Sequence, residues 1–367
     1  MIQKVLCISL GYEGGCLYYA NKLIDNLRSD KDVWISYQTL SPNAAACKRL
    51  KIRGGIKNVV LNTLFNLPFY IVAIIKGLIY QRWSCVIVFG PNIWDGVFLG
   101  LFRLFGKKGY YVIHDGLLHE GENDWFHQSL TKASMRAASN HIFLSDNVRS
   151  LVQQQLGIVR PFNIVPHGII AYNNTCLIQN EGVLKDDYEQ LHPRFLMIGR
   201  INKYKGIDLL FEAVKSIDFS KIDCITIAGF FADNVVVPEY VKLNPQIRLI
   251  NKYLTDEEFD SLMSSHDYLL MPYWEATQSG IAAASIGYEL PAIVSKVGAM
   301  EEQFGSAAIY MDAITPEALA TCIDKVVNNA KTYEDIQVRL RLKKQELSWE
   351  SLGEKLKVIV DENIAFD

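Results

Sequence analysis

Two loops of this chain carry residues whose types and spacing suit the binding of a diphosphate. Arg200 and Lys205 lie on one loop, just after an apolar run that ends at Gly199. An arginine grips phosphate oxygens with a planar fork, and a lysine supplies a mobile point charge. Ser279 and Gly280 lie at the start of a helical pattern, where backbone N–H groups are free and a residue without a side chain lets an anion approach. Together the loops predict an anion site made of two cations and a helix terminus.

A third group of polar residues follows a strand-like run in the first half of the chain. His114, Asp115 and His119 occur close together there, and His167 follows another apolar run. Residues 114 and 119 do not share a helix face, so their spacing does not predict a metal site. A histidine at a strand end is a candidate for binding or catalysis, and a buried structural role is the alternative for each.

The elements that must position these residues alternate between strand-like and helical patterns. Short apolar runs predict strands at residues 5–10, 33–36, 85–89, 110–114, 141–144, 162–165, 195–198, 224–228, 247–250, 268–271, 292–295 and 307–311. Amphipathic patterns predict helices at residues 16–27, 130–138, 207–216, 256–264 and 349–364. This alternation is typical of parallel sheets covered by helices on both faces. It predicts an α/β chain with two sheets of about six strands each, whose ligands bind where the strands end.

Length and composition indicate a folded chain of two domains. Its 367 residues exceed one typical core, and 50% of them are hydrophobic while 21% are charged. A polar stretch without periodicity, residues 173–189, marks the boundary. We therefore expect domains at residues 1–172 and 173–347, followed by a helical segment at residues 348–367.

Charge is unevenly distributed between the two halves. Residues 1–175 hold 18 Lys and Arg against 10 Asp and Glu, a balance of +8, whereas residues 176–367 hold 19 against 30, a balance of −11. In the first half, a basic run at residues 48–57 precedes an apolar run at residues 59–80. The apolar run contains Pro68 and Lys76, which makes it a poor spanning helix but suits a helix at a membrane surface. The alternative is a core-facing helix beside a solvated basic loop.

The cysteines and the start of the chain indicate its compartment. The seven cysteines are scattered and form no Cys-x-x-Cys pair, which favours reduced thiols over disulfides or a zinc site. A strand-like run begins at residue 5 and leaves no room for a signal peptide, so we expect a cytoplasmic location.

The two phosphate-binding loops resemble those of a known family. In the first, a strand is followed by Gly-Arg at 199–200, Lys-Gly at 205–206 and a helix; in the second, a strand ending in Pro at 272 leads to Ser-Gly at 279–280, a helix and Pro-Ala-Ile-Val at 291–294. Both resemble retaining glycosyltransferases of family four, the glycosyl transferases group one. The resemblance implies the GT-B fold: two facing Rossmann-like domains with parallel sheets, and a C-terminal helix that packs on the N-terminal domain.

The second loop departs from the family pattern at its carboxylates. Many members have two glutamates separated by seven residues, whereas here Glu275 lies out of register and the second position falls on Ala284 or Ser285. The pattern therefore looks like that of a branch of the family with Thr-Gln-Ser-Gly in this loop. Glu275 keeps only a weak assignment to the sugar side, and Glu302 is the alternative carboxylate for the ribose. The donor-binding residues implied here are Gly199, Thr277, Gln278, Ser279, Gly280 and Glu302.

The resemblance also assigns roles in the first half of the chain. His114 is similar to the family's histidine near the reacting sugar, and with Arg200 and Lys205 it forms the expected catalytic set. The loop that contains Gly14 and Gly15 lacks an intact dinucleotide fingerprint, and in the family this loop closes over the reaction centre and contacts the donor. The residues expected on the acceptor or sugar side are Asp115, His119 and His167, together with Glu275.

The implied activity is retaining, hexosyltransferase-type transfer of a sugar from a UDP- or GDP-sugar to a hydroxyl of a glycan or lipid-linked saccharide. No cofactor and no metal are expected, because the cations and the helix terminus would stabilise the leaving diphosphate. The basic first half suits bacterial surface polysaccharide assembly at the inner face of the cytoplasmic membrane, with contact through the segment from Lys48 to Tyr80. Nucleic acid is not an expected partner. A nucleotide-sugar epimerase of the same fold and a catalytically degenerate nucleotide-sugar-binding subunit stay open as alternatives.

Overall fold

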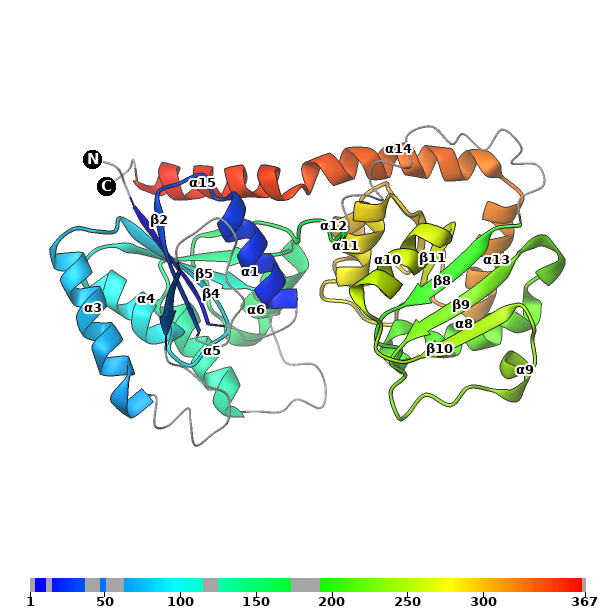
Figure 1. Cartoon of the computed structure of the whole chain (residues 1–367), viewed down its shortest axis with the longest axis horizontal. Helices are drawn as coiled ribbons and strands as arrows, with labels where there is room; N and C mark the ends of the chain where they lie inside the picture. The colour runs from blue at the N-terminus through cyan, green and yellow to red at the C-terminus, as the bar shows by residue number, and fades with distance from the viewer. Residues whose placement is uncertain are drawn as a thin grey trace. The chain divides into compact units, whose positions relative to one another are not determined.

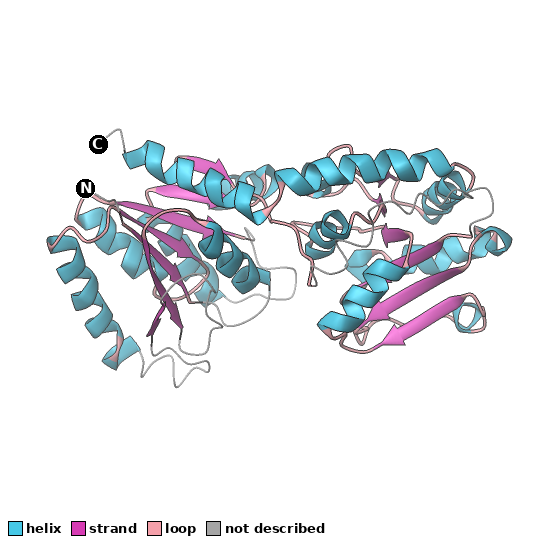
Figure 2. Cartoon of the chain, turned by 45° about the horizontal axis from the view of Figure 1, so that its top comes forward, coloured by secondary structure: helices cyan, strands magenta, loops and turns pink. Residues whose placement is uncertain are grey.

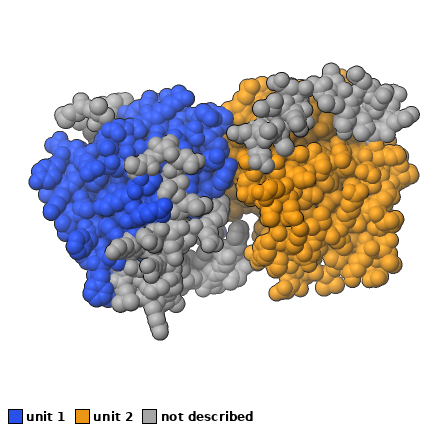
Figure 3. Space-filling model, in the orientation of Figure 1, with its two compact units in different colours: residues 1–168, 348–367 blue, residues 169–347 orange. Residues whose placement is uncertain are grey.

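Two parallel β-sheets organise the chain, one in each of two structural units (Figure 1). The computed structural model describes residues 4–10, 15–36, 47–50, 63–114, 125–172 and 192–364. The first unit consists of Met1–Gly168 and Ser348–Asp367, and the second of Ile169–Leu347 (Figure 3). The sequence analysis places these two divisions after residues 172 and 347.

The sheet of the first unit has seven strands in the order β3-β2-β1-β4-β5-β6-β7, and all its pairs are parallel. Its strands are β1 (Val5–Ser9), β2 (Lys31–Ser36), β3 (Cys47–Leu50), β4 (Cys85–Phe89), β5 (Lys108–Ile113), β6 (Asn140–Phe143) and β7 (Phe162–Ile164). Its helices are α1 (Gly15–Asn26), α3 (Leu67–Ile79), α4 (Asp95–Leu104), α5 (Trp125–Ala137), α6 (Asp146–Leu156) and α15 (Trp349–Ile364). Every residue of β1 and β4 is buried, as expected for strands covered on both faces.

The sheet of the second unit has six parallel strands in the order β10-β9-β8-β11-β12-β13. Its strands are β8 (Arg194–Ile198), β9 (Cys224–Gly229), β10 (Ile247–Asn251), β11 (Tyr268–Met271), β12 (Ala292–Val294) and β13 (Ile309–Tyr310). Its α-helices are α8 (Ile207–Ala213), α9 (Glu239–Lys242), α10 (Asp256–Ser265), α11 (Gly280–Tyr288), α12 (Met300–Phe304), α13 (Pro316–Val327) and α14 (Ala330–Glu346), and its 3-10 helices are η2 (Lys203–Lys205), η3 (Val214–Ser216) and η4 (Phe219–Lys221).

Both sheets reverse their strand order beside the first strand of the unit. In the second unit the chain runs from β8 to β9 and β10 on one side, then returns to β11, β12 and β13 on the other. At such a reversal the connections leave to opposite faces of the sheet and open a crevice at the carboxyl ends of the strands. The loops that follow β8 and β11 therefore lie at the place where open α/β sheets bind their ligands.

Each unit has its own apolar core between its sheet and its helices. The core of the first unit includes Val86, Phe98 and Phe143, and that of the second includes Ile225, Leu269 and Ile293. Figure 2 shows the strands of each unit as one sheet with helices packed against it. Two Rossmann-like α/β units with parallel sheets are what the sequence predicts.

The last helix belongs to the first unit although the chain reaches it from the second. A Cβ on Gly353 would lie 2.3 Å from the carbonyl oxygen of Asn26, so α15 approaches the end of α1 to within backbone contact. The hydroxyl of Tyr110 in β5 donates to the carbonyl oxygen of Ile359 at 3.4 Å. The C-terminal helix thus packs on the N-terminal unit, as the resemblance implies.

One strand, β3, is not predicted from the sequence. Cys47–Leu50 forms the edge strand β3, which pairs with β2 so that Cys47 lies beside Val33. A solvated basic loop was one of the two expectations for the start of this segment. Lys48 and Arg49 are exposed on it. Charged residues are common on short edge strands because they discourage pairing with other chains, and they remove the apolar pattern that reveals a strand. The remainder of the basic run, residues 51–57, lies outside the described residues.

Candidate functional site

The loops after β8 and β11 meet in the second unit. The backbone N–H of Trp274 donates to the carbonyl oxygen of Tyr204 at 2.8 Å, which joins one loop to the other. Gly206 has a positive φ of 73°, and a Cβ on it would lie 1.8 Å from the carbonyl oxygen of Pro272. Only glycine satisfies both demands. The two loops, which the sequence predicts to lie close together, are therefore in direct backbone contact.

Lys205 is the buried cation of this site. The residue is only 8% exposed. Its Nζ lies 5.7 Å from the centre of the Tyr273 ring, and a Cβ on Gly199 would lie 3.1 Å from it. Burial, and then the charge of Arg200, lower the pKa of Lys205 from its ordinary value of 10.5 to about 8. A buried ammonium group normally has a carboxylate beside it.

The two cations of the site lack such a carboxylate. Across the described ranges, neither Arg200 nor Lys205 forms a salt bridge, and Arg200 is exposed on the same loop. Two positive groups close enough to affect each other's protonation, without a neutralising acid among these residues, favour an anion from outside the chain. This arrangement is the strongest indication of a ligand in the structure.

The start of α11 adds further hydrogen-bond donors to the site. Ser279 is the N-cap, and its hydroxyl accepts from the N–H of Ala282 at 3.3 Å. Gly280 is exposed, and the nearest atom to a Cβ there would be Ile170 Cδ1 at 3.6 Å, so its backbone is open to a ligand. Helix geometry leaves the N–H groups of Gly280 and Ile281 without an intrahelical acceptor. They form a helix terminus suited to phosphate.

Gln303 fixes this helix terminus, and the sequence analysis did not identify it. Its side chain is buried, its Oε1 accepts from the N–H of Ser279 at 3.0 Å, and its Nε2 donates to the carbonyl oxygen of Ser279 at 3.3 Å. The turn before α12 approaches closely, since a Cβ on Gly298 would lie 1.5 Å from the carbonyl oxygen of Ala276. Gln303 thus occupies the Ser279 amide and leaves the next two N–H groups for a ligand. The only feature of the sequence that could have pointed to Gln303 is its position next to the predicted ribose carboxylate, Glu302.

Tyr273 connects the cationic loop with the helix terminus. It is buried, its ring faces Lys205, and its hydroxyl shares a hydrogen bond with the side chain of Ser279. Burial raises the pKa of Tyr273, so the phenol stays neutral and adds no negative charge next to the ammonium group. Lys205, Tyr273, Ser279 and Gln303 therefore form one connected set.

The predicted donor-side residues Thr277, Gln278 and Glu302, and Glu275 of the predicted sugar side, lie on the same loop or in α12. Thr277 and Gln278 are partly buried just before Ser279, whereas Glu275 and Glu302 are exposed. The residue beside Glu275, Trp274, donates from its indole nitrogen to Asp208 Oδ1 at 3.0 Å, which fixes the start of the loop.

His114 and His167 come together in the first unit around Tyr19. The ring centres of Tyr19 and His114 are 4.8 Å apart, those of Tyr19 and His167 5.7 Å, and those of His167 and Trp349 5.8 Å. The Tyr19 hydroxyl donates to the carbonyl oxygen of Val165 at 2.9 Å. Two histidines predicted separately, from the ends of β5 and β7, therefore belong to one buried aromatic cluster.

The cluster keeps its histidines uncharged. Burial, followed by the neighbouring His167, lowers the pKa of His114 from its ordinary value of 6.5 to about 3. Burial also lowers the pKa of His167, whose Nδ1 lies 2.6 Å from the carbonyl oxygen of Gly168. Within the described residues, the buried Nε2 of His114 has no hydrogen-bond partner. A buried nitrogen without a partner is a candidate for a hydrogen bond to a ligand or a water molecule.

Several predicted site residues lie outside what the structure describes. Gly14, Asp115 and His119 fall in the ranges that are left out, and Gly15 begins α1. Their assignments stay predictions.

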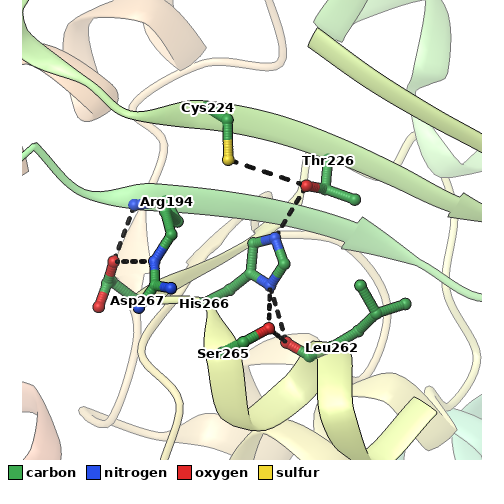
Figure 4. Close-up of polar contacts among 7 residues, drawn as sticks. All are labelled: Arg194, Cys224, Thr226, Leu262, Ser265, His266 and Asp267. Carbon is green, nitrogen blue, oxygen red and sulfur yellow. Dashed lines mark hydrogen bonds and ion pairs between the residues drawn. The ribbon is translucent and has the colours of Figure 1, made fainter. Parts of the chain in front are cut away.

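A second polar cluster in the second unit is structural and lies at the opposite end of the strands (Figure 4). His266 Nε2 lies 2.8 Å from Thr226 Oγ1 and its Nδ1 lies 2.8 Å from the carbonyl oxygen of Leu262, while Asp267 Oδ2 accepts from the backbone N–H of Arg194 at 2.8 Å. These contacts end α10 and fix the start of β8. Within the described residues, no three His, Cys, Asp or Glu side chains are grouped so that they could hold a metal ion.

Comparison with known proteins adds to this geometry. Residues 192–329, within the second unit, match the family model described as "Glycosyl transferases group 1". No curated protein sequence is significantly similar to the chain.

Solved structures resemble the whole chain. Sucrose-phosphate synthase from Thermosynechococcus elongatus superposes with a TM-score of 0.70 at 15% identity, covering 100% of both chains. HepE of Anabaena, in complex with UDP, superposes with a TM-score of 0.66 at 12% identity, covering 98% of this chain and 100% of HepE. WaaG, a glycosyltransferase involved in lipopolysaccharide biosynthesis, superposes with a TM-score of 0.62 at 14% identity, covering 97% of this chain and 99% of WaaG. These likenesses confirm the predicted fold class, α/β of the GT-B type, and with the family match they support a glycosyltransferase.

The histidine cluster makes the first unit sensitive to acid. Because the folded-state pKa of His114 lies near 3, below its ordinary value of 6.5, the unfolded chain takes up the proton first, so stability is complete above pH 6.5 and decreases as pH falls toward 3. Between pH 7 and pH 5 the loss from His114 alone should be about 2 kcal/mol. Urea unfolding at both pH values should show a smaller loss for His114→Phe. His192→Gln, at an exposed histidine, should behave like the wild type, and an equal loss in all three proteins would contradict the prediction.

Proposed function

We propose that this chain transfers a sugar from a nucleoside-diphosphate-sugar to a hydroxyl group of a glycan or lipid-linked saccharide. The observation that carries the proposal is the pair Arg200 and Lys205, which has no carboxylate partner among the described residues and lies on the loop joined to the start of α11. A diphosphate supplies the negative charge that this arrangement lacks. The family match and the GT-B fold support the same reading.

The donor in this proposal is a UDP- or GDP-sugar. Arg200, Lys205 and the N–H groups at the start of α11 bind the two phosphates, and Gly199 and Gly280 let them approach the backbone. Thr277, Gln278 and Glu302 would contact the sugar or ribose. The likeness to HepE, whose structure holds UDP, supports a nucleoside diphosphate.

The transfer would proceed by substitution at the anomeric carbon. The bond from that carbon to the diphosphate oxygen breaks, a bond to the acceptor oxygen forms on the same face, and the acceptor proton passes to the departing phosphate, so that configuration is retained. Negative charge grows on the diphosphate while the sugar becomes oxocarbenium-like. Arg200, Lys205 and the helix terminus stabilise that charge without a divalent metal, because they are positive and fixed in place beforehand.

His114 is the proposed contribution of the first unit to the reaction. Its Nε2 is buried, neutral and without a partner among the described residues, so it can exchange a hydrogen bond with a sugar hydroxyl without introducing a charge. His167 shares its cluster and would hold it in position. Asp115, His119, Gly14 and Gly15 remain candidates for the acceptor or donor side.

A role in bacterial surface polysaccharide synthesis at the inner face of the cytoplasmic membrane is the setting we propose. The likeness to WaaG, described as involved in lipopolysaccharide biosynthesis, supports it. Among helices within the described residues, none is long and apolar enough to span a bilayer. Any contact with the membrane by these helices would therefore be at its surface.

The proposal is tested with a panel of nucleotide-sugars. A nucleotide-sugar that binds the folded chain should raise its melting temperature, and product should form with an acceptor in the presence of EDTA. Arg200→Ala should reduce kcat about 100-fold, since one lost transition-state donor costs that much. Lys203→Ala, at an exposed lysine of the same loop, should leave kcat nearly unchanged.

The same assay separates the alternatives. An Arg200→Ala enzyme with most of its turnover would exclude the proposed role of this loop. An isomeric nucleotide-sugar formed without acceptor would identify an epimerase, and tight binding without turnover would identify a degenerate subunit.

Donor capture should weaken in alkali through Lys205. With a pKa of about 8, its ammonium group loses its proton as pH rises through that value, and the neutral amine no longer attracts a diphosphate. The kcat/KM for the donor, which reports the free enzyme, should therefore fall above pH 8. Lys205→Arg should carry activity to higher pH because a guanidinium stays charged. Identical alkaline limbs for the wild type and Lys205→Arg would rule this out.

Gln303 should position the helix terminus rather than act in the chemistry. Gln303→Glu keeps an acceptor for the Ser279 N–H but loses the donor to its carbonyl and adds a negative charge near the phosphates. It should raise the donor KM about tenfold with little change in kcat. Ser285→Ala is the matched control. Ser285 is buried in α11, the helix whose start Gln303 contacts, and its hydroxyl donates to the carbonyl oxygen of Leu290 at 2.6 Å. A lower melting temperature with unchanged KM in both variants would reduce Gln303 to a structural role.

A further inference from the structure

Helix α3 of the first unit has two apolar faces. Leu67, Ile74 and Leu78 are buried in the core of the unit. On its other side, Phe65, in the helical turn just before α3, and Phe69 are 71% and 79% exposed. A helix that only covers a sheet has polar residues on its outer side.

The exposed apolar residues form one continuous stripe. Phe69, Val72, Lys76 and Ile79 follow the spacing i, i+3, i+7 and i+10 within α3, which places them on one helix face, and Phe65 lies just before Asn66, the N-cap of the helix. We call these five residues the α3 stripe. Val72 and Ile79 are 50% and 61% exposed, and Lys76 is exposed among them. A contiguous exposed apolar face of this kind marks an interaction surface.

The surroundings of the stripe are basic. Residues 47–50 and 63–83 contain no Asp or Glu. Lys48 of the edge strand β3 lies with its Nζ 5.7 Å from the ring centre of Tyr70 in α3, and Arg82 follows the helix. The nearby carboxylate of Asp32 accepts from Arg82 Nε at 2.7 Å and from the indole of Trp83 at 2.8 Å. Lys76 is thus an exposed cation of the stripe with no acid in residues 63–83, and Lys48 lies beside the helix with its Nζ 4.1 Å from the ring centre of Trp34.

We propose that the α3 stripe binds the surface of an anionic lipid bilayer. Large apolar side chains enter the boundary between headgroups and acyl chains, while lysines at the rim meet anionic headgroups. A second copy of the chain fits less well, because a two-fold contact through the stripe would bury Lys76 of each copy, and residues 63–83 offer no acid to neutralise it. This deepens the proposed function by placing the enzyme where a lipid-linked acceptor is found. The binding itself requires neither donor nor acceptor.

Cosedimentation of the full chain with vesicles tests the apolar part. The vesicles contain phosphatidylcholine with about one quarter phosphatidylglycerol, at low salt and without nucleotide-sugar. The wild type should sediment with them, and the double variant Phe65→Ser/Phe69→Ser should lose about tenfold in partitioning. Val236→Ser/Leu243→Ser is the matched control, since these residues of the second unit are 81% and 73% exposed. It should bind like the wild type.

A charge variant and a lipid-free measurement complete the test. Lys76→Glu should weaken binding about tenfold at low salt, and the wild type should bind less to vesicles of phosphatidylcholine alone. The proposal is overturned if the wild type stays in the supernatant at low salt, or if Phe65→Ser/Phe69→Ser binds as tightly as the wild type. It is also overturned if sedimentation velocity without lipid shows that this variant converts a dimer into a monomer. The rise in melting temperature that a nucleotide-sugar produces should be the same for all these proteins. Failure of the membrane proposal is therefore distinct from failure of the proposed function.

Discussion

The anion site depends on one backbone contact, in which the carbonyl group of Pro272 occupies the space that a side chain on residue 206 would need. Because Gly206 has no side chain and adopts a left-handed conformation, the loop after β8 packs directly on the loop after β11. Both loops leave neighbouring parallel strands. The cations of one loop and the helix terminus of the other are therefore held at one sheet edge before any ligand binds, which is the condition for electrostatic stabilisation of a developing anion.

The second unit accepts an electrostatic penalty to keep this site. Burying Lys205 disfavours its charged form, and Arg200 adds repulsion, yet no described carboxylate compensates either group. A structural lysine would relax to solvent or pair with an acid. Tyr273 shows the same preference, because it packs against the ammonium group as a neutral phenol. An anion that enters the site would offset this unfavourable term while both groups stay charged, so the energetics and the geometry point to the same ligand chemistry.

The sequence reveals those parts of the fold and the site that depend on local patterns. Short apolar runs predict β8 and β11, and the rule that parallel strands bind ligands at their carboxyl ends brings Arg200 and Ser279 together. Gln303 could not be predicted, because its hydrogen bonds to Ser279 depend on how α12 packs against the start of α11, which no local sequence pattern reveals. The cluster around Tyr19 was hidden for the same reason, since Trp349 joins it only when α15 returns to the first unit. Strand β3 was missed because its charged residues carry no apolar period.

The segment from Lys48 to Tyr80 carries two sequence interpretations that do not exclude each other. A core-facing helix and a helix at a membrane surface both require apolar residues, and composition cannot separate them. The structure divides them by position: Ile74 and Leu78 face the core, whereas Phe69 and Val72 face outward. An inner face alone would need only half of these apolar residues. The excess on the outer face is costly to expose to water, and the lipid surface that we propose as its partner would remove this cost and meet the exposed Lys76.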